Sequence, residues 1–122
     1  MKQYIVSLYP SKDNVLEVFD EMAVHLSERI NKDSHKESML MTMLSIESVY
    51  LSEEVHQVCK YIYDDWQQIY VDIFHHFGYQ QDAINMAQSV FALIHGSMIS
   101  SWIKHNGEDL LLIRPVLKQL LK

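Results

Sequence analysis

Seven histidines are the most chemically versatile side chains of this 122-residue chain, because imidazole binds metals and titrates near neutral pH. His75 and His76 are neighbours and so point in different directions on a helix, while His56 lies one helical turn from Glu53. No His-Glu-x-x-His motif or other ligand triple occurs, and the single cysteine, Cys59, excludes a cysteine-rich zinc site. We therefore expect no metal or other cofactor, and interpret these histidines as surface side chains or partners of a helix C-terminus.

The sequence contains no recognisable catalytic motif. There is no nucleophile elbow, no phosphate-binding glycine loop and no Ser-His-Asp pattern. Cys59 is interpreted as a small buried apolar residue rather than a reactive thiol. We predict that the protein is not an enzyme and has no catalytic residues. A metal-dependent helical enzyme that uses His56, His75 or His105 is kept as an alternative.

Aromatic and methionine side chains give the strongest indication of a binding site. Aromatic rings stack on flat ligands and methionine repacks around irregular ones, so walls of these residues suit small apolar or aromatic compounds. They gather in three segments: Met39, Met41 and Met43; Tyr61, Tyr63, Trp66 and Tyr70; and Phe91, Met98 and Trp102. His95 lies among apolar residues and is either a satisfied buried or interface histidine, or a ligand contact or pH-sensitive group. The alternative is that the aromatic and methionine residues are ordinary core, with Tyr61 exposed.

The composition limits the class of protein. Apolar residues make up 48% of the chain, enough for one domain with a true core. Ten Lys and Arg against sixteen Asp and Glu give a charge of −6, which argues against binding of nucleic acid by these residues. The chain has no signal-peptide-like start and no apolar run of roughly 18 residues. We expect a soluble, cytoplasmic protein without a membrane segment.

Apolar residues follow helical spacing through nearly the whole chain, which predicts an all-α fold of about five helices. A short helix end should stop at Pro10. The next helix should begin near Ser11 or Asp13, whose side chains can accept from free N–H groups, and run to about Ile30. A polar connection is expected at residues 31–36.

After a short Met-rich helix at 39–49, the apolar spacing predicts three further helices. The clearest of them follows the N-cap Ser52 and is closed by Gly78 in a left-handed conformation. A further helix is expected at 81–105 and a last one at 110–121.

The last two predicted helices carry more apolar surface than one core can cover. Ala92, Gly96 and Ser100 are spaced four apart and form a narrow strip without bulky side chains. Glycine inside a helix costs about 1 kcal/mol relative to alanine, and close approach of another helix is the usual offset. The adjacent leucines at 110–112 are a second sign of excess apolar surface, because one core face cannot cover all of them. Pro115 should kink the last helix or mark its true start. We predict self-association through these helices.

The segment from Ser45 to Cys59, followed by Trp66, resembles the regulatory domain of TetR-family repressors, most closely the LmrA/YxaF-like subgroup. That subgroup carries a Glu and a small residue, then Ser-Glu, Cys and Trp, which fall without a gap on Glu47-Ser48, Ser52-Glu53, Cys59 and Trp66. Gln81-Asp82-Ala83, Ile94-His95-Gly96 and the terminal leucines also resemble the last two helices of the family.

The resemblance implies that residues 1–10 are the tail of a connecting helix and residues 11–122 the ligand-sensing and dimerisation domain. A three-helix helix-turn-helix head would precede them; it is missing from this chain, so DNA would be a partner only through that head. A second alignment places residues 8–12 on the Phe-Pro-Ser-Lys stretch that ends the head in many members. The chain departs from the family in lacking the glycine that often precedes the short Met-rich helix.

The resemblance also implies a mechanism and a set of site residues. Two copies would pair through residues 88–103 and 110–121 as a four-helix bundle, with an interface at Ala92, Gly96, Ser100, Ile103, Leu112, Val116 and Leu120. A small apolar or aromatic effector would enter between the long helices and contact Met22, Met43, Cys59, Tyr63, Trp66, Tyr70, Phe91, His95 and Met98. Its binding would move the connecting helix and respace two DNA-reading heads. The alternative function is a stand-alone helical dimerisation protein without a ligand.

Overall fold

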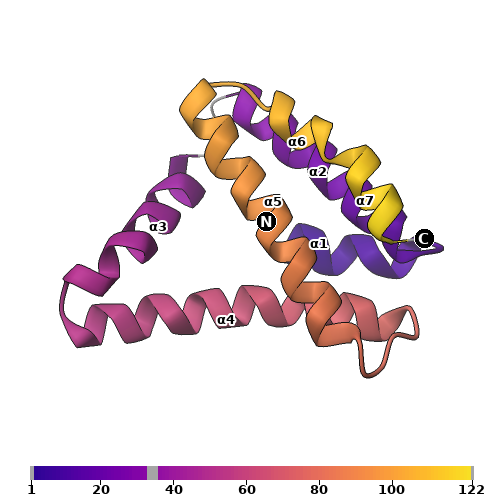
Figure 1. The fold of residues 1–122 in the computed structure, drawn as a ribbon, viewed down its shortest axis with the longest axis horizontal. Helices are drawn as coiled ribbons and strands as arrows, with labels where there is room; N and C mark the ends of the chain where they lie inside the picture. Colours follow the sequence, from indigo (N-terminus) through magenta and orange to yellow (C-terminus); the bar gives the residue numbers. More distant parts are fainter. Residues whose placement is uncertain (1, 33–35, 122) are drawn as a thin grey trace.

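The computed structural model describes residues 2–32 and 36–121, and over these ranges it contains helices and short connections without any strand (Figure 1). The predicted all-α class is confirmed. The elements are α1 (Lys2–Leu8), η1 (Tyr9–Ser11), α2 (Val15–Asn31), α3 (Lys36–Glu47), η2 (Ser48–Tyr50), α4 (Glu53–His76), α5 (Ala83–Lys104), α6 (Glu108–Leu112) and α7 (Arg114–Leu120).

The start of α2 differs from the predicted one. Asn14 is the N-cap, and its Oδ1 accepts a hydrogen bond from the Glu17 N–H at 3.0 Å. Ser11 belongs to η1 instead, where its Oγ donates to the Leu8 carbonyl at 2.8 Å, and the Asp13 N–H donates to Glu17 Oε2 at 3.1 Å. The prediction of Ser11 or Asp13 as the cap was therefore wrong by one to three residues.

The ends of α4 agree with the prediction. Ser52 Oγ accepts from the Val55 N–H at 3.2 Å, and Glu53 and Glu54 lie in the first turn, at the positive end of the helix dipole. Gly78 follows the helix with φ of +91°, the left-handed conformation that glycine adopts without strain. The polar connection expected at 31–36 falls partly on residues 33–35, which lie outside the described ranges.

The predicted last helix is two short helices. Pro115 lies in the first turn of α7, where its missing N–H costs nothing, so of the two alternatives it marks a true start. Arg114, next to it, donates from Nε to Asp20 Oδ1 at 2.7 Å and from Nη2 to Oδ2 at 2.9 Å. This ion pair joins α7 to α2.

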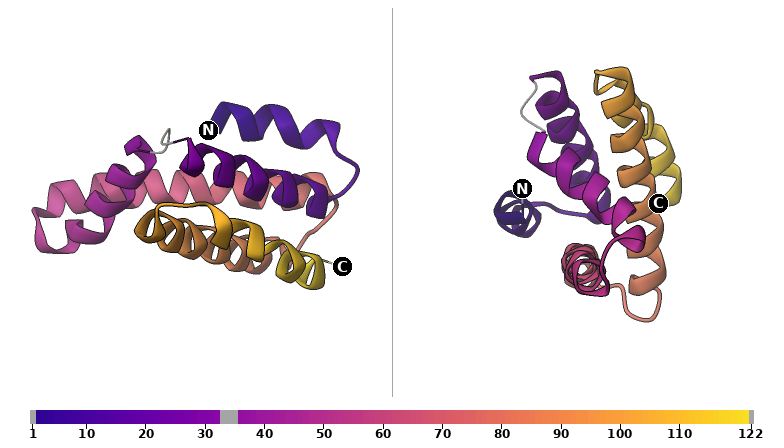
Figure 2. Two further views of the ribbon diagram at one scale, coloured as in Figure 1. Left: turned by 90° about the horizontal axis from the view of Figure 1, so that it is seen from above. Right: turned by 90° about the vertical axis from the view of Figure 1, so that its left-hand side faces the viewer.

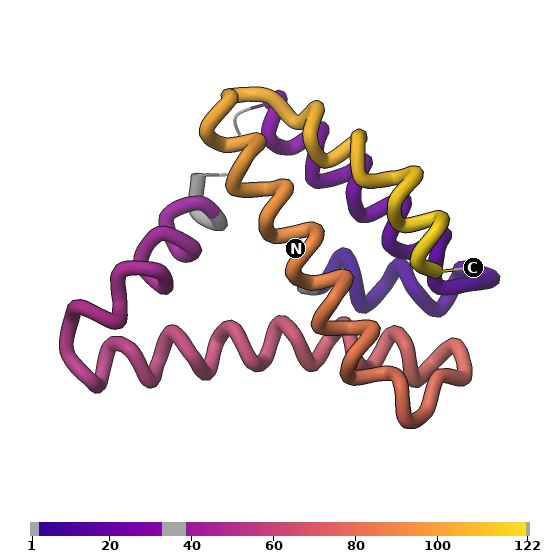
Figure 3. Tube along the Cα trace, in the orientation of Figure 1, coloured from indigo at the N-terminus to yellow at the C-terminus, as the bar shows by residue number. Residues whose placement is uncertain are grey.

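The helices α2, α6 and α7 pack together at one end of the molecule, and α3 stands apart from them at the other end. In Figure 1, α3 and α5 rise from opposite ends of α4, while α2 lies alongside α6 and α7. The trace in Figure 3 shows the chain turning back after α4, so that α5 crosses it. Figure 2 places α5, α6 and α7 along one side of the molecule and α1 on the opposite side.

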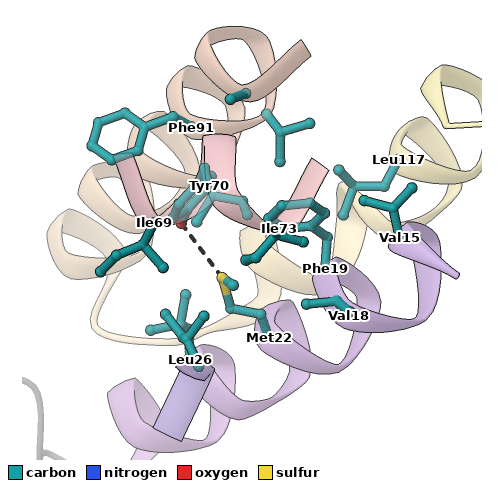
Figure 4. Close-up of a cluster of buried hydrophobic side chains, with 14 of the residues drawn as sticks. Val15, Val18, Phe19, Met22, Leu26, Ile69, Tyr70, Ile73, Phe91 and Leu117 are labelled. Atoms are coloured by element: carbon teal, nitrogen blue, oxygen red, sulfur yellow. Dashed lines mark hydrogen bonds between the residues drawn. The ribbon is translucent and has the colours of Figure 1, made fainter. Parts of the chain in front are cut away.

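The core fills the space where α2, α4 and α5 meet (Figure 4). Phe19 of α2 packs against Tyr70 and Phe74 of α4, with ring centroids 5.3 and 5.4 Å apart. Tyr70 is buried, and its hydroxyl donates to Met22 Sδ at 3.4 Å. Burial raises the pKa of the Tyr70 phenol far above its ordinary value, so it stays a neutral donor. Among the described helices, none combines the length and apolar character needed to cross a membrane.

Candidate functional site

A cavity of about 220 Å³ lies beside this core, between the long helices. Helices α1, α2, α3, α4 and α5 contribute its walls. Most of the lining side chains are aromatic, aliphatic or methionine, and a few are polar. The residues that line it are Ile5, Met22, Leu26, Met41, Thr42, Ser45, Ile62, Tyr63, Trp66, Tyr70, Phe91, His95 and Met98.

Phe91 is the centre of the aromatic wall. The Tyr63 and Tyr70 rings meet it edge-on, with centroids 5.1 and 5.0 Å away. The His95 ring, one turn further along α5, stacks on it at 3.9 Å. These rings hold one another in place, so the wall is formed before any ligand arrives.

His95 supplies an imidazole to this wall. Its Nδ1 lies 3.0 Å from the Phe91 carbonyl oxygen of its own helix. Burial lowers the pKa of His95 below its ordinary value of 6.5, and the bond to the Phe91 carbonyl offsets only part of that shift. The ring is therefore neutral at pH 7.

The cavity is covered unevenly. Met22 and Leu26 of α2 and Phe91 of α5 are buried, whereas Met41 and Thr42 of α3 are half-buried. Ser45, Ile62, Tyr63 and Trp66 are half-buried as well. The approach from solvent is therefore between α3 and the first half of α4.

Most of the residues expected to contact a ligand line this cavity: Met22, Tyr63, Trp66, Tyr70, Phe91, His95 and Met98. Two do not. Met43 is exposed on α3, and Cys59 is buried but not part of the lining. Met41, which the sequence also offered as a wall residue, lines the cavity, and the lining residues not expected from the sequence are Ile5, Leu26, Thr42, Ser45 and Ile62.

The other histidines among residues 2–32 and 36–121 are not part of the cavity lining. His56 Nδ1 lies 3.1 Å from Ser48 Oγ, and Ser48 Oγ in turn donates to the Ser45 carbonyl at 2.6 Å. His75 and His76 end α4, and His105 caps α5 with φ of 59°. Within residues 2–32 and 36–121 no group of three His, Cys, Asp or Glu side chains is placed to hold a metal ion.

The residues that carry the TetR resemblance mostly build the corner between α3 and α4. Ser48 is buried and hydrogen-bonded within the corner, and Ser52 caps α4. Glu53 Oε1 accepts from Gln57 Nε2 at 2.8 Å. Of the motif positions Glu47, Ser48, Ser52, Glu53, Cys59 and Trp66, Trp66 lines the cavity, so these positions mainly set the direction in which α4 leaves the corner.

The helices that carry the residues expected at a dimer interface, α5, α6 and α7, lie on the opposite side of the molecule from α1 (Figure 2). Ile103 is 75% exposed and Leu112 64% exposed, and Val116 and Leu120 are also exposed. Ala92 and Gly96 are exposed too. Ser100 is half-buried, and its hydroxyl donates to Asp109 Oδ2. Lys104 Nζ lies 3.0 Å from the same carboxylate oxygen.

The domain is expected to become less stable when the pH is lowered below about 6.5. The pKa values of His25 and His95 are both lowered in the folded protein, chiefly by burial, and His25 stacks on Tyr4 with centroids 4.0 Å apart. The unfolded chain therefore binds more protons below pH 6.5, and the free energy of unfolding decreases as the pH falls through the folded values. The carboxyl group of Asp109 does not interfere in this window, because its pKa is lowered below 3.8.

Urea unfolding followed by circular dichroism at pH 7.5 and pH 5.5, at one protein concentration, measures this effect. The His25→Phe, His95→Phe double variant should lose less stability between these pH values than the unchanged protein. Equal stability of the unchanged protein at both pH values would contradict the prediction.

An all-helical domain with a preformed aromatic cavity beside its core is an architecture suited to binding a small molecule. The family described as "Transcriptional regulator LmrA/YxaF-like, C-terminal domain" matches residues 15–115, more than four fifths of the chain, and the protein belongs to this family of TetR-type regulators. The role that defines the family is regulatory rather than catalytic. Comparison with curated proteins and with solved structures found no significant match.

Proposed function

We propose that this domain senses a small aromatic effector in its cavity and pairs with a second copy of itself, as part of a TetR-type transcriptional regulator. The observation that carries the proposal is the cavity, because a domain that served only to dimerise has no need of one beside its core. Residues 1–10 would be the end of a connecting helix and residues 11–122 the sensing and dimerisation unit.

The size of the cavity limits the effector. An engineered cavity of about 150 Å³ holds benzene, and ligand pockets for larger compounds begin near 300 Å³. At about 220 Å³, the cavity suits a compound of one or two rings.

The contact between α1 and the cavity supports coupling of ligand binding to the connecting helix. Ile5 is 1% exposed and lines the cavity, although it lies near the start of the described chain. Tyr4 stacks on His25 of α2, and Tyr9 meets His76 of α4 edge-on at 5.1 Å. A ligand that displaces Ile5 would therefore tilt α1 against two aromatic contacts, which gives the liganded and empty states different energies.

The surface of α5, α6 and α7 supports pairing of two copies. Gly96 has nothing within 4 Å of the position where a Cβ would be, so no contact within one copy requires glycine there. Since glycine in a helix costs about 1 kcal/mol relative to alanine, a close approach from outside explains it. The exposed side chains of Ile103, Leu112 and Val116 would supply the apolar part of such an interface.

Filling the cavity should abolish ligand binding. Thr42 lines the half-buried side, so Thr42→Trp is expected to block the cavity while leaving the core intact. In a thermal-melting screen of one- and two-ring aromatic compounds, a ligand at about 100 times its Kd stabilises the domain by roughly 2.7 kcal/mol, which is several degrees.

The matched control is Thr42→Val, which keeps the size of the side chain and should keep the shift. If no aromatic compound raises the melting temperature of the unchanged protein, or if Thr42→Trp responds as strongly as Thr42→Val, the cavity is not the binding site. The first of these outcomes favours the stand-alone dimerisation protein.

A further inference from the structure

The tautomer of His95 is fixed by its hydrogen bond to the backbone. A carbonyl oxygen only accepts, so at 3.0 Å from the Phe91 carbonyl the His95 Nδ1 must carry the hydrogen. In a neutral imidazole the other nitrogen, Nε2, is then a bare acceptor. Stacking on Phe91 at 3.9 Å holds the ring in this orientation.

Nε2 has no hydrogen-bond partner among the described side chains of residues 3–32 and 39–121, although His95 lines the cavity. The Tyr63 ring lies beside it, with centroids 5.7 Å apart, and two other hydroxyls of the wall are engaged elsewhere. The Tyr70 hydroxyl donates to Met22 Sδ, and the Ser45 hydroxyl donates to the Met41 carbonyl at 2.9 Å. His95 is half-buried, and a ligand with a donor would supply Nε2 with a hydrogen bond in a largely apolar surrounding.

The cavity offers no charge to an ionic ligand. No Asp, Glu, Lys or Arg side chain belongs to its described lining. An anion would face the lone pair of Nε2, and a cation would lack a carboxylate partner in an apolar surrounding. Both kinds of ion are therefore disfavoured against a neutral compound of the same shape.

We propose that His95 selects the effector: a neutral one- or two-ring aromatic compound with an O–H or N–H group that donates to His95 Nε2. This inference rests on the proposed function, because it assigns the ligand class of the same cavity. His95 then determines specificity through one directed acceptor in a wall that otherwise binds by shape.

Three probes that share one ring system test the proposal: 2-naphthol, 2-methoxynaphthalene and 2-naphthoate. Their affinities are measured by quenching of tryptophan fluorescence at pH 7.5, with the complete chain. We expect 2-naphthol to bind about three- to tenfold more tightly than 2-methoxynaphthalene, the range for one hydrogen bond between neutral groups, and 2-naphthoate to bind most weakly.

The variant His95→Phe keeps a ring that can stack on Phe91 and removes the acceptor. It should bind 2-naphthol and 2-methoxynaphthalene with nearly equal affinity, while the control Tyr63→Phe, which removes another polar atom from the same wall, should keep the selectivity. His95→Gln places an amide oxygen near the position of Nε2 and should keep part of the selectivity for 2-naphthol. This second variant keeps the test valid if His95→Phe fails to fold.

The outcomes separate the two proposals. If the naphthyl probes bind but His95→Phe leaves the selectivity unchanged, or if 2-naphthoate binds most tightly, His95 does not select a donor and the cavity remains a ligand site. If loss of selectivity follows Tyr63→Phe instead, the selecting group is the Tyr63 hydroxyl. If none of the probes binds the unchanged protein, both the selection and the proposed aromatic-sensing function are overturned.

Discussion

Replacing Ile103 with glutamate is expected to convert the proposed dimer to a monomer. Ile103 lies near the end of α5 with 75% of its surface exposed, and Leu112 of α6 and Val116 of α7 are exposed as well. Burying an unpaired carboxylate between two copies costs several kcal/mol, and each chain already carries a charge of −6. A penalty of about 3 kcal/mol weakens the association roughly 100-fold.

Sedimentation velocity at several concentrations measures this change. The matched control is Val49→Glu, because Val49 is an apolar residue 60% exposed in η2, at the α3–α4 corner rather than on the α5–α7 surface. We expect Val49→Glu to remain dimeric. If Ile103→Glu stays dimeric, or if Val49→Glu is the variant that dissociates, the two copies pair through another surface.

Gly107→Ala is expected to destabilise the domain by about 2–3 kcal/mol, because the added methyl group has no space. A Cβ at this position would lie 2.6 Å from Ser27 Cα and 2.5 Å from the Ser27 carbonyl oxygen. The same loop donates and accepts hydrogen bonds with α2. Ser27 Oγ donates to the Gly107 carbonyl at 2.7 Å, and the Gly107 N–H donates to Asn31 Oδ1 at 2.9 Å. Moving the loop to make room would break both.

Urea unfolding measures this loss, and a glycine with open surroundings supplies the control. Gly96→Ala meets nothing within 4 Å, so in the monomeric Ile103→Glu background it should raise the free energy of unfolding by up to about 1 kcal/mol. A Gly107→Ala variant as stable as the unchanged protein would show that the α5–α6 connection can move away from α2 at little cost.

Features set by a few adjacent residues could be predicted from the sequence. Ser52 and Gly78 bound α4 as expected, because an N-cap hydroxyl and a left-handed glycine act through their own turn of the chain. The Asn14 cap was missed for a related reason. Three of four successive residues, Ser11, Asp13 and Asn14, can cap a helix, and η1 uses Ser11 to end its own turn.

Features that depend on how helices meet could not be predicted. Met41 and Met43 are two residues apart and so lie on nearly opposite sides of α3, and because that helix is apolar all round, its pattern does not tell which side meets the cavity. Ile5 was missed because its burial depends on the packing of α1 against the cavity, to which no local pattern points. The residue separations of three and four along α4 and α5 did bring Tyr63, Trp66 and Phe91 to one wall.

Occupation of the cavity by a small aromatic compound can be tested directly with the two tryptophans of the chain. Trp66 lines the cavity, whereas Trp102 is buried in the core and is not part of the lining. Two-dimensional ¹H–¹⁵N NMR of the indole N–H groups, assigned with Trp66→Phe, follows both during titration with 2-naphthol. If the compound binds in the cavity, the Trp66 signal moves with saturable dependence on concentration while the Trp102 signal stays in place. An unmoved Trp66 signal, or movement of Trp102 alone, would show that the compound does not occupy the cavity.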